Sequence, residues 1–280
     1  MTVREALRTA EGMLREAQVP DARLDAEYLL AEVLDAPRLL VCLSGETVLT
    51  EARLETFFTL VERRKTREPL QYILGTQPFM GFDFLVTPDV LIPRADTEAL
   101  CEQALLYAAD GKKVLDLCTG SGALAVAIKK LSPLCLVTAA DISKEALAIA
   151  KQNAAMNKVD VRFVQGDLWE AVPNERFSVI VSNPPYIPTA DLPALQEEVK
   201  REPCLALDGG ADGLNFYRRI IEGAPAHLEA GGALLLETGD GESEAVAQLM
   251  VKDFENIRTV NDLNGLPRVV LGTLRHMEDT

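Results

Sequence analysis

Beyond residue 112 the sequence alternates between short apolar runs and amphipathic helical patterns. Val114–Leu117 and Leu136–Ala140 are typical of buried strands, and the segments Ala123–Leu131 and Ser143–Asn157 that follow them have helical apolar spacing. Strands joined through helices pair in parallel, which places helices on both faces of the sheet. The sequence therefore predicts an α/β fold with a doubly wound, Rossmann-like domain.

The same alternation continues towards the C-terminus. Further strands are predicted at 159–164, 177–182, 233–236, 258–260 and 268–274, and further helices at 214–228 and 242–251. The last two strands flank a turn at Asn264-Gly265, the dipeptide that favours tight hairpins. We therefore expect an antiparallel strand at the edge of the sheet.

The first seventy residues predict helices only. Apolar spacing indicates a helix over Val3–Gln18, a second over Asp21–Leu34 with Asp21 as N-cap, and a third over Thr50–Lys65 with Thr50 as N-cap. The third helix ends in Arg63-Arg64-Lys65, where cations suit the negative end of the helix dipole. We interpret this basic end as a solvated helix terminus rather than a binding patch.

The pattern changes at Glu68-Pro69. From Leu70 to Pro93 aromatic and β-branched residues alternate with turn formers, which predicts a short β-hairpin between two domains. The predicted organisation is an N-terminal helical domain at 1–72, a hairpin linker at 73–93 and the doubly wound domain at 94–280.

Composition limits the classes of partner and site. The chain has 43 acidic and 28 basic residues, a formal net charge of −15, so on average it repels nucleic acids. Five cysteines without a C-x-x-C pair and only two histidines make a zinc site or a disulfide framework poor hypotheses, and we expect no metal. No apolar run approaches the roughly 18 residues that span a bilayer, and we expect a cytoplasmic protein.

A glycine-rich turn connects the first predicted strand of the sheet to its helix. Gly120 and Gly122 let the backbone approach a ligand closely, and Asp141 closes the next strand 19 residues after Gly122. A carboxylate there can accept hydrogen bonds from both hydroxyls of a ribose. On its own this pattern also fits an NAD-dependent dehydrogenase.

Asp116 favours a different cofactor. An acid inside the strand before the turn would repel a pyrophosphate but attract the ammonium and sulfonium groups of S-adenosylmethionine. The alternative is that Asp116 only holds the loop backbone. Asp167, at the end of the third strand, could bind an adenine amino group, whereas Trp169 is equally well explained as a core residue.

Asn183-Pro184-Pro185-Tyr186 follows the strand at 177–182 directly. Two prolines make this segment rigid, and neither has an N–H to donate, so their carbonyls remain available as acceptors. The Asn183 side-chain oxygen and the Pro184 carbonyl could each accept one N–H of a planar carboxamide or aminopurine, and Tyr186 could cover its flat face. Such alignment supplies most of what methyl transfer needs. The alternative is a purely structural turn.

Taken together, these motifs resemble the release factor glutamine methyltransferases, which modify the glutamine of the Gly-Gly-Gln loop in peptide chain release factors. The resemblance covers nearly the whole chain, through the segments Glu68–Gly75, Val90–Glu98, Asp116–Gly122, Asn183–Ile187, Leu205–Gly210, Asp212–Leu214 and Asp262–Gly265. It implies a class I methyltransferase fold, S-adenosylmethionine as cofactor, class 1 release factors as partners, and a docking role for the N-terminal helices.

The resemblance also implies roles for individual residues. The implied cofactor-binding residues are Asp116, Cys118, Thr119, Gly120, Ser121, Gly122, Asp141, Asp167, Leu168, Trp169 and Asn183. The implied substrate-binding residues are Asn183, Pro184, Pro185, Tyr186, Phe79 and Arg94, of which Asn183, Pro184 and Tyr186 would be catalytic. Thr97 and Glu98, like Arg94, would support the site or only cap a helix.

Two positions depart from the family pattern. Cys118 stands where the family usually has Gly, and because a cysteine disfavours positive φ we expect negative φ there. Ala95 stands where Pro is usual.

Three alternatives to this function remain open from the sequence. The first is an adenine N6 amino-methyltransferase acting on DNA or RNA, which shares the Asn-Pro-Pro-Tyr motif. The others are an NAD-dependent dehydrogenase and a binding protein that has kept the fold without activity.

Overall fold

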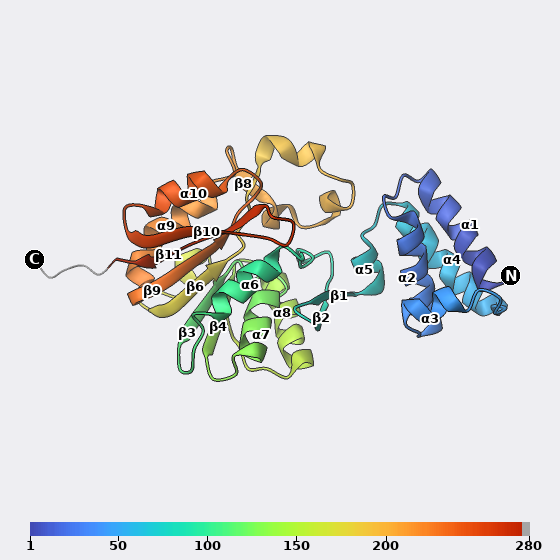
Figure 1. The fold of residues 1–280 in the computed structure, drawn as a ribbon, viewed down its shortest axis with the longest axis horizontal. Coiled ribbons are helices and arrows are strands. Elements are labelled where there is room, and N and C mark those ends of the chain that lie inside the picture. Colours follow the sequence, from blue (N-terminus) through green and yellow to red (C-terminus); the bar gives the residue numbers. More distant parts are fainter. Residues whose placement is uncertain (276–280) are drawn as a thin grey trace, which may run out of the picture. The chain divides into compact units, whose positions relative to one another are not determined.

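The computed structural model describes residues 1–275, which form two compact units (Figure 1). The first unit comprises Met1–Gly75 together with Gln196–Arg201, and the second comprises Thr76–Leu195 and the chain from Glu202 onward. Among the described residues no helix is long and apolar enough to cross a membrane. The same part of the chain holds no cluster of three or more His, Cys, Asp or Glu side chains that could bind a metal ion.

The first unit is helical, as predicted. Its helices are α1 (Val3–Glu16), α2 (Ala22–Leu34), α3 (Arg38–Leu43), α4 (Glu51–Lys65) and α5 (Leu70–Leu74). Thr50 caps α4 by accepting a hydrogen bond from the Arg53 N–H, as expected, whereas the Asp21 side chain makes no capping bond to α2. The hairpin prediction is wrong for Leu70–Leu74, a single helical turn that ends at Gly75 in the left-handed conformation.

Arg64 is buried, so the interpretation of the basic end of α4 as fully solvated is wrong for this residue. Its guanidinium contacts Asp25 and Glu198, each at 2.7 Å, and Arg67 binds Glu198 at 2.5 Å. Burial raises the pKa of Asp25. Burial also tends to raise the pKa of Glu198, but hydrogen bonds from Arg67 and Arg64 lower it to about 2. These ion pairs hold the segment Gln196–Arg201 within the helical unit.

The second unit contains a seven-stranded sheet in the order β10-β11-β9-β6-β3-β4-β5. Its strands are β3 (Lys113–Leu117), β4 (Leu136–Asp141), β5 (Arg162–Gln165), β6 (Phe177–Ser182), β9 (Leu228–Glu237), β10 (Phe254–Asn261) and β11 (Pro267–Leu274). All neighbours pair in parallel except that β11 is antiparallel to both β9 and β10. The antiparallel strand therefore lies one place inside the edge, not at the edge as predicted, because β10 pairs on its outer side.

Helices cover both faces of this sheet. The helices α6 (Thr97–Leu105), α7 (Ala123–Leu131) and α8 (Lys144–Asn157) pack into one apolar core, and α9 (Asn215–His227) and α10 (Ser243–Met250) pack into the other. Figure 1 shows the two groups on opposite sides of the strands. The predicted doubly wound fold is confirmed.

Short elements complete the second unit. They are the hairpin β1 (Thr76–Phe79) and β2 (Phe82–Leu85), the pair β7 (Ile187–Pro188) and β8 (Asp208–Gly210), and the 3₁₀ turns η1 (Leu168–Ala171), η2 (Thr189–Ala194) and η4 (Cys204–Ala206). A further 3₁₀ turn, η3 (Val199–Arg201), lies in the segment that belongs to the helical unit.

The order of the strands places the functional motifs together. The chain proceeds from β3 to β4 and β5 in one direction and returns to β6 and β9 in the other, so β3 lies at the topological switch point. Ligands of doubly wound sheets bind at the carboxyl ends of the strands beside this point. The glycine turn after β3, Asp141 at the end of β4 and Asn183 after β6 all lie there.

The Arg64 cluster gives a first prediction. Replacing Arg64 with Met leaves the Asp25 carboxyl buried without its cation, and breaking a buried ion pair in this way costs about 3–5 kcal/mol. Urea unfolding followed by far-UV circular dichroism should show this loss. In the control Arg63→Met the lost partner is Glu68 and the Arg63 side chain is 43% exposed, so the loss should stay below about 1 kcal/mol. Equal losses in the two variants would contradict the account.

Candidate active site

The turn between β3 and α7 depends on its two glycines. Both have positive φ, 54° at Gly120 and 80° at Gly122. A Cβ atom on Gly122 would lie 2.9 Å from the Cβ of Ala150 in α8, so only glycine allows this close packing. The Gly120 N–H donates to Asp141 Oδ2 at 2.8 Å, which joins the turn to the end of β4.

Cys118 has a φ of 60°, so the predicted negative φ is wrong. The backbone turns here between two hydrogen bonds: the Thr119 N–H donates to the Ala140 carbonyl at 3.0 Å and continues the pairing of β3 with β4, and the Gly122 N–H donates to the Thr119 carbonyl at 2.8 Å. Left-handed backbone costs a non-glycine residue about 1–2 kcal/mol. Burial raises the pKa of the Cys118 thiol, which therefore stays neutral.

Asp141 has its carboxylate fixed by backbone groups. Its Oδ2 accepts from Gly120 and its Oδ1 accepts from the Ser143 N–H at 2.9 Å. Ser143 in turn caps α8, as predicted, by accepting from the Ala146 N–H at 3.0 Å. The Ile142 N–H also hydrogen-bonds to this carboxylate, whose pKa burial raises and the three backbone N–H groups lower.

Asp116 lies behind the glycine turn rather than in the cavity wall. It is fully buried, its Oδ2 accepts from the Thr119 hydroxyl at 2.5 Å, and its Oδ1 has no hydrogen-bond partner. Burial raises its pKa to about 7, although the Thr119 hydrogen bond lowers it. This geometry fits the alternative in which the acid holds the loop, and a direct contact with the cofactor stays a prediction.

A cavity with an empty volume of about 910 Å³, including its open mouth, lies at the carboxyl ends of β3, β4 and β6. Its polar side chains include Asp141, Asp167 and Asn183, and the Cys118 and Gly120 segment also lines it. Asp167 forms an ion pair with Arg219 at 2.7 Å. The apolar part of the wall is formed by Ile142, Ala146, Leu168 and Phe216. A cavity that combines carboxylates with apolar side chains suits a nucleoside with a cationic tail.

Several predicted cofactor residues do not line this cavity. Thr119, Ser121 and Gly122 shape the turn from behind. Trp169 donates from Nε1 to the Arg219 carbonyl at 3.0 Å and stacks on His227 with ring centroids 4.6 Å apart. The tryptophan is partly buried and packs against the apolar core on the α9 side of the sheet, which is closer to the packing alternative than to cofactor binding.

Asn183 and Pro185 line the same cavity. The Asn183 Nδ2 donates to the Thr97 hydroxyl at 3.3 Å, so the amide nitrogen points towards α6. This contact joins the Asn-Pro-Pro-Tyr motif to the predicted supporting residue Thr97, 86 positions earlier in the chain.

Tyr186 is supported by glycine backbone from a distant motif. A Cβ on Gly209 would lie 2.7 Å from the Tyr186 Cα, and a Cβ on Gly213 would overlap the Tyr186 carbonyl oxygen. On the other side, a Cβ on Gly239 would lie 2.9 Å from the Tyr186 ring. Gly209 of the Leu205–Gly210 segment and Gly213 of the Asp212–Leu214 segment are thus explained by close packing against this tyrosine. Burial raises the pKa of the Tyr186 hydroxyl.

Phe79 and Arg94, both predicted to bind substrate, lie elsewhere than in the described cavity. Phe79 is 1% exposed and packs against Phe84 with ring centroids 6.0 Å apart, as in the core alternative. Arg94 forms an ion pair with Glu202, whose other oxygen accepts from the Ile92 N–H at 3.0 Å. Their substrate contacts stay predictions.

No sequence motif predicts a site role for the buried carboxyls Glu202 and Glu237 or for the cavity residues Phe216 and Arg219. For Glu237 a signal existed, because it directly follows the apolar run 233–236 at the carboxyl end of a parallel strand.

Comparison with known proteins identifies the family. Residues 5–75 match the family model for the PrmC N-terminal domain, and residues 96–199 match the methyltransferase small domain. The release factor glutamine methyltransferase of Geobacter sulfurreducens is 46% identical over 98% of this chain and 97% of its own length. The enzyme of the same name from Moorella thermoacetica is 42% identical over 98% and 99%.

The chain belongs to the release factor glutamine methyltransferase family. The resemblance inferred from the sequence motifs is therefore confirmed. The prediction that the protein is an S-adenosylmethionine-dependent methyltransferase is confirmed with it. The dehydrogenase and adenine methyltransferase alternatives are not favoured.

Solved structures agree on the fold. A methyltransferase from Pyrococcus furiosus is 22% identical and matches 70% of this chain and 90% of its own with a TM-score of 0.55. A Thermus thermophilus 16S rRNA N2 G1207 methyltransferase, solved with AdoMet and guanosine, is 19% identical and matches 71% of this chain and 50% of its own with a TM-score of 0.50.

The buried Asp116 carboxyl predicts a pH-dependent stability. Its raised folded-state pKa means that ionisation costs stability once the pH exceeds the unfolded value of about 3.9, and the full cost applies above about 7. Asp116→Asn should therefore stabilise the cofactor-free enzyme more at pH 8 than at pH 5, by about 2 kcal/mol. Denaturant unfolding at the two pH values measures this difference, and an equal effect at both would contradict the assignment.

The close packing of Gly209 against Tyr186 predicts an effect of substitution on kcat. In Gly209→Ala the new methyl group meets the Tyr186 backbone, so the Asn-Pro-Pro-Tyr segment must shift, and a displacement of about 1 Å at a reacting group can cost 100-fold in rate. We expect kcat to fall by about that factor while the affinity for S-adenosylhomocysteine stays within about threefold. Gly12→Ala, whose Cβ would have open space, serves as the control and should leave kcat unchanged.

Proposed function

We propose that this enzyme transfers a methyl group from S-adenosylmethionine to the side-chain amide nitrogen, N5, of the glutamine in the Gly-Gly-Gln motif of peptide chain release factors. Asn183 carries the proposal, because it lines the cavity at the switch point with its amide nitrogen bound to Thr97. This orientation leaves Oδ1 free to accept an N–H from a substrate carboxamide. Family membership supports the same substrate.

The cavity residues fit the cofactor. The Asp141 carboxylate, held by backbone N–H groups at the cavity wall, would accept from the ribose hydroxyls, and the apolar slot beside Leu168 and Phe216 suits the adenine. We propose that Asp167, which also lines the cavity, binds the adenine amino group. S-adenosylmethionine, when bound, supplies a methyl group activated by its sulfonium. Cys118 and Gly120 line the same cavity as Asp141 and Asn183, and we propose that they bind the methionine portion.

The chain's own contribution is to hold a poor nucleophile. A carboxamide nitrogen reacts slowly because its lone pair is delocalised into the carbonyl. If Asn183 Oδ1 and the Pro184 carbonyl each accept one of its N–H groups, the nitrogen is fixed in position and its lone pair can turn towards the donor. Tyr186 would cover the face of the amide. Orientation of this kind can account for about 7–11 kcal/mol of a barrier.

We infer no general base. The nitrogen becomes strongly acidic only after it has been alkylated, and its proton can then pass to water. The described part of the chain places no histidine in the cavity wall, in keeping with this inference.

Release factors are the proposed protein partners, with the N-terminal helical unit as a docking module. Because release factors act on ribosomes, we place the activity in the cytoplasm. The net charge of −15 agrees with a protein substrate and disfavours tight binding to nucleic acid.

The direct test uses labelled cofactor and a purified class 1 release factor. Mass spectrometry should locate the label on the Gly-Gly-Gln glutamine, and a release factor with that glutamine changed to alanine should remain unlabelled. Label on another residue, or on neither protein, would contradict the proposed function.

Asn183→Ala should lower the rate of methyl transfer by at least about 100-fold, because the substrate amide loses one of its two hydrogen-bond acceptors. The affinity for S-adenosylhomocysteine, measured by calorimetry, should be nearly unchanged. Wild-type turnover in this variant would remove Asn183 from the mechanism.

A further inference from the structure

Glu237 is a buried carboxyl beside the Asn-Pro-Pro-Tyr motif. It ends β9, and the pairing of Ser182 with Leu236 places it next to Asn183 across the neighbouring parallel strands. The residue is 1% exposed, and its Oε2 has no hydrogen-bond partner. Burial raises its pKa to about 7. A carboxyl kept in such a place costs stability, which makes a functional role worth testing.

Thr97 connects Glu237 with Asn183. The threonine is 5% exposed and begins α6. Its hydroxyl accepts from Asn183 Nδ2 at 3.3 Å, and a hydrogen bond from the same hydroxyl lowers the pKa of the Glu237 carboxyl, which burial raises. A hydroxyl has one proton to give, so once Glu237 accepts it, the remaining lone pairs of Thr97 can only accept. They therefore select the nitrogen end of the Asn183 amide rather than its oxygen end.

We propose that Glu237 is a positioning residue that acts through Thr97 to fix which way the Asn183 amide faces. This proposal rests on the proposed function, because only the correct orientation presents Oδ1 to a substrate N–H. A flipped amide would present Nδ2 instead, a donor facing a donor. Glu237 itself does not touch substrate in this scheme.

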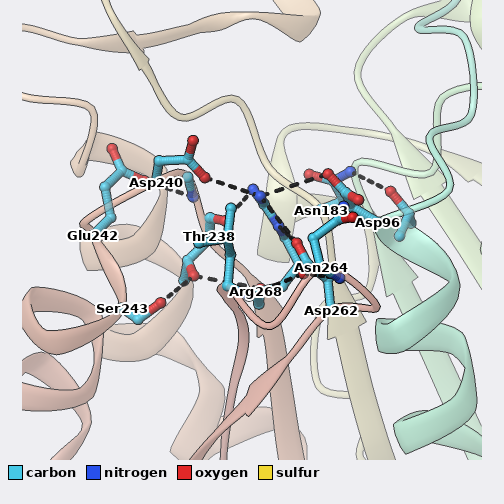
Figure 2. Close-up of polar contacts among 12 residues, drawn as sticks. Asp96, Asn183, Thr238, Asp240, Glu242, Ser243, Asp262, Asn264 and Arg268 are labelled. Carbon is cyan, nitrogen blue, oxygen red and sulfur yellow. Dashed lines mark hydrogen bonds and ion pairs between the residues drawn. The ribbon is translucent and has the colours of Figure 1, made fainter.

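A network around Arg268 holds the start of α6, where Thr97 lies. The Arg268 Nη2 lies 3.5 Å from Asp96, 2.9 Å from Asp240 and 3.4 Å from Asp262. Figure 2 shows Asp240 on one side of this guanidinium and Asp96 and Asn183 on the other. Asp262 belongs to the Asp262–Gly265 segment and also accepts the N–H groups of Asn264 and Leu266. This distant motif thereby helps to fix the residue before Thr97.

Besides the neutral hydroxyl of Thr97, several charged groups surround the Glu237 carboxyl. The pKa of Glu237 responds to three charges: Arg268 in β11, Arg94 in the segment before α6, and Asp96 at the start of α6. The two cations favour the ionised form that accepts from Thr97, and Asp96 opposes it. The Tyr217 hydroxyl donates at 2.9 Å to the Glu237 backbone carbonyl, which anchors the end of β9 from the other face of the sheet.

The experiment compares four variants with the wild type. Thr97→Val and Glu237→Met remove the connection, Thr97→Ser retains the hydroxyl, and Thr238→Val is the control. Thr238 is also fully buried, and its hydroxyl contacts Ser243 at 2.7 Å and the Arg268 backbone carbonyl at 3.4 Å rather than Thr97 or Asn183. For each protein we would measure kcat and KM with the release factor, the affinity for S-adenosylhomocysteine and the melting temperature.

We expect Thr97→Val and Glu237→Met to lower kcat by about 10- to 100-fold, with KM and cofactor affinity within about threefold of wild type. Thr97→Ser should recover most of the rate. Thr238→Val should lose stability comparably but keep its kcat. Equal kcat losses in Thr238→Val and Thr97→Val, or no recovery in Thr97→Ser, would overturn the proposal in favour of a structural role.

A second readout does not depend on the substrate. The side-chain amide signal of Asn183, assigned in an NMR spectrum by its loss in Asn183→Ala, should shift in Thr97→Val and Glu237→Met but not in Thr97→Ser or Thr238→Val. An unchanged signal in the first two variants would overturn the proposal. If instead the wild type fails to methylate release factors while the signal shifts as expected, the proposed function fails and the positioning contact stands.

Discussion

The parallel pairing of β3 with β6 is the constraint on which the site depends. Leu117 pairs with Ser182, and the Ser182 hydroxyl donates to the Leu117 carbonyl at 2.7 Å. The residues that follow, Cys118 and Asn183, are therefore neighbours at the carboxyl edge of the sheet although they lie far apart in the chain. A shift in this register would separate the glycine turn from the Asn-Pro-Pro-Tyr motif, and no loop adjustment could restore the cavity.

Around this edge the protein buries polar groups that cost stability. Asp116 and Glu237 are both almost fully enclosed, and each has one oxygen without a partner. Cys118 adds a left-handed backbone conformation. Apolar packing on both faces of the sheet offsets these costs, since the strands at the centre are buried along nearly their whole length. Preorganisation of this kind avoids reorganising the site during the reaction.

Much of the fold was predictable because its signals are local. Alternating apolar runs and helical patterns indicate strands and helices, and capping residues such as Thr50 and Ser143 mark where helices begin. The short helix α3 was missed because six residues give too little periodicity. The helix α5 was taken for part of a strand because it contains the aromatic Tyr72 and the β-branched Ile73. The burial of Arg64 depends on Asp25 and Glu198, which the tertiary fold brings to it.

The candidate site likewise contains residues that could be predicted from local sequence signals and residues that could not. Asp141 ends β4, Asp167 lies two residues after β5 and Asn183 directly follows β6, so their place at the cavity could be inferred from strand order alone. The contact between Asn183 and Thr97, and the role of Glu202 beside Arg94, arise from segments that meet only in the folded chain. The positive φ of Cys118 was also unpredictable from residue type, because the hydrogen bonds of the turn override the intrinsic preference.

The central claim is that the segment from Asn183 to Tyr186 holds a carboxamide beside the methyl donor. A crystal structure of the enzyme with S-adenosylhomocysteine and a peptide containing Gly-Gly-Gln tests it most directly. The account predicts the cofactor product against Asp141 and Gly120, and the glutamine amide nitrogen about 3 Å from both Asn183 Oδ1 and the Pro184 carbonyl oxygen. A glutamine side chain bound elsewhere, or an Asn183 amide turned with Nδ2 towards it, would contradict the account.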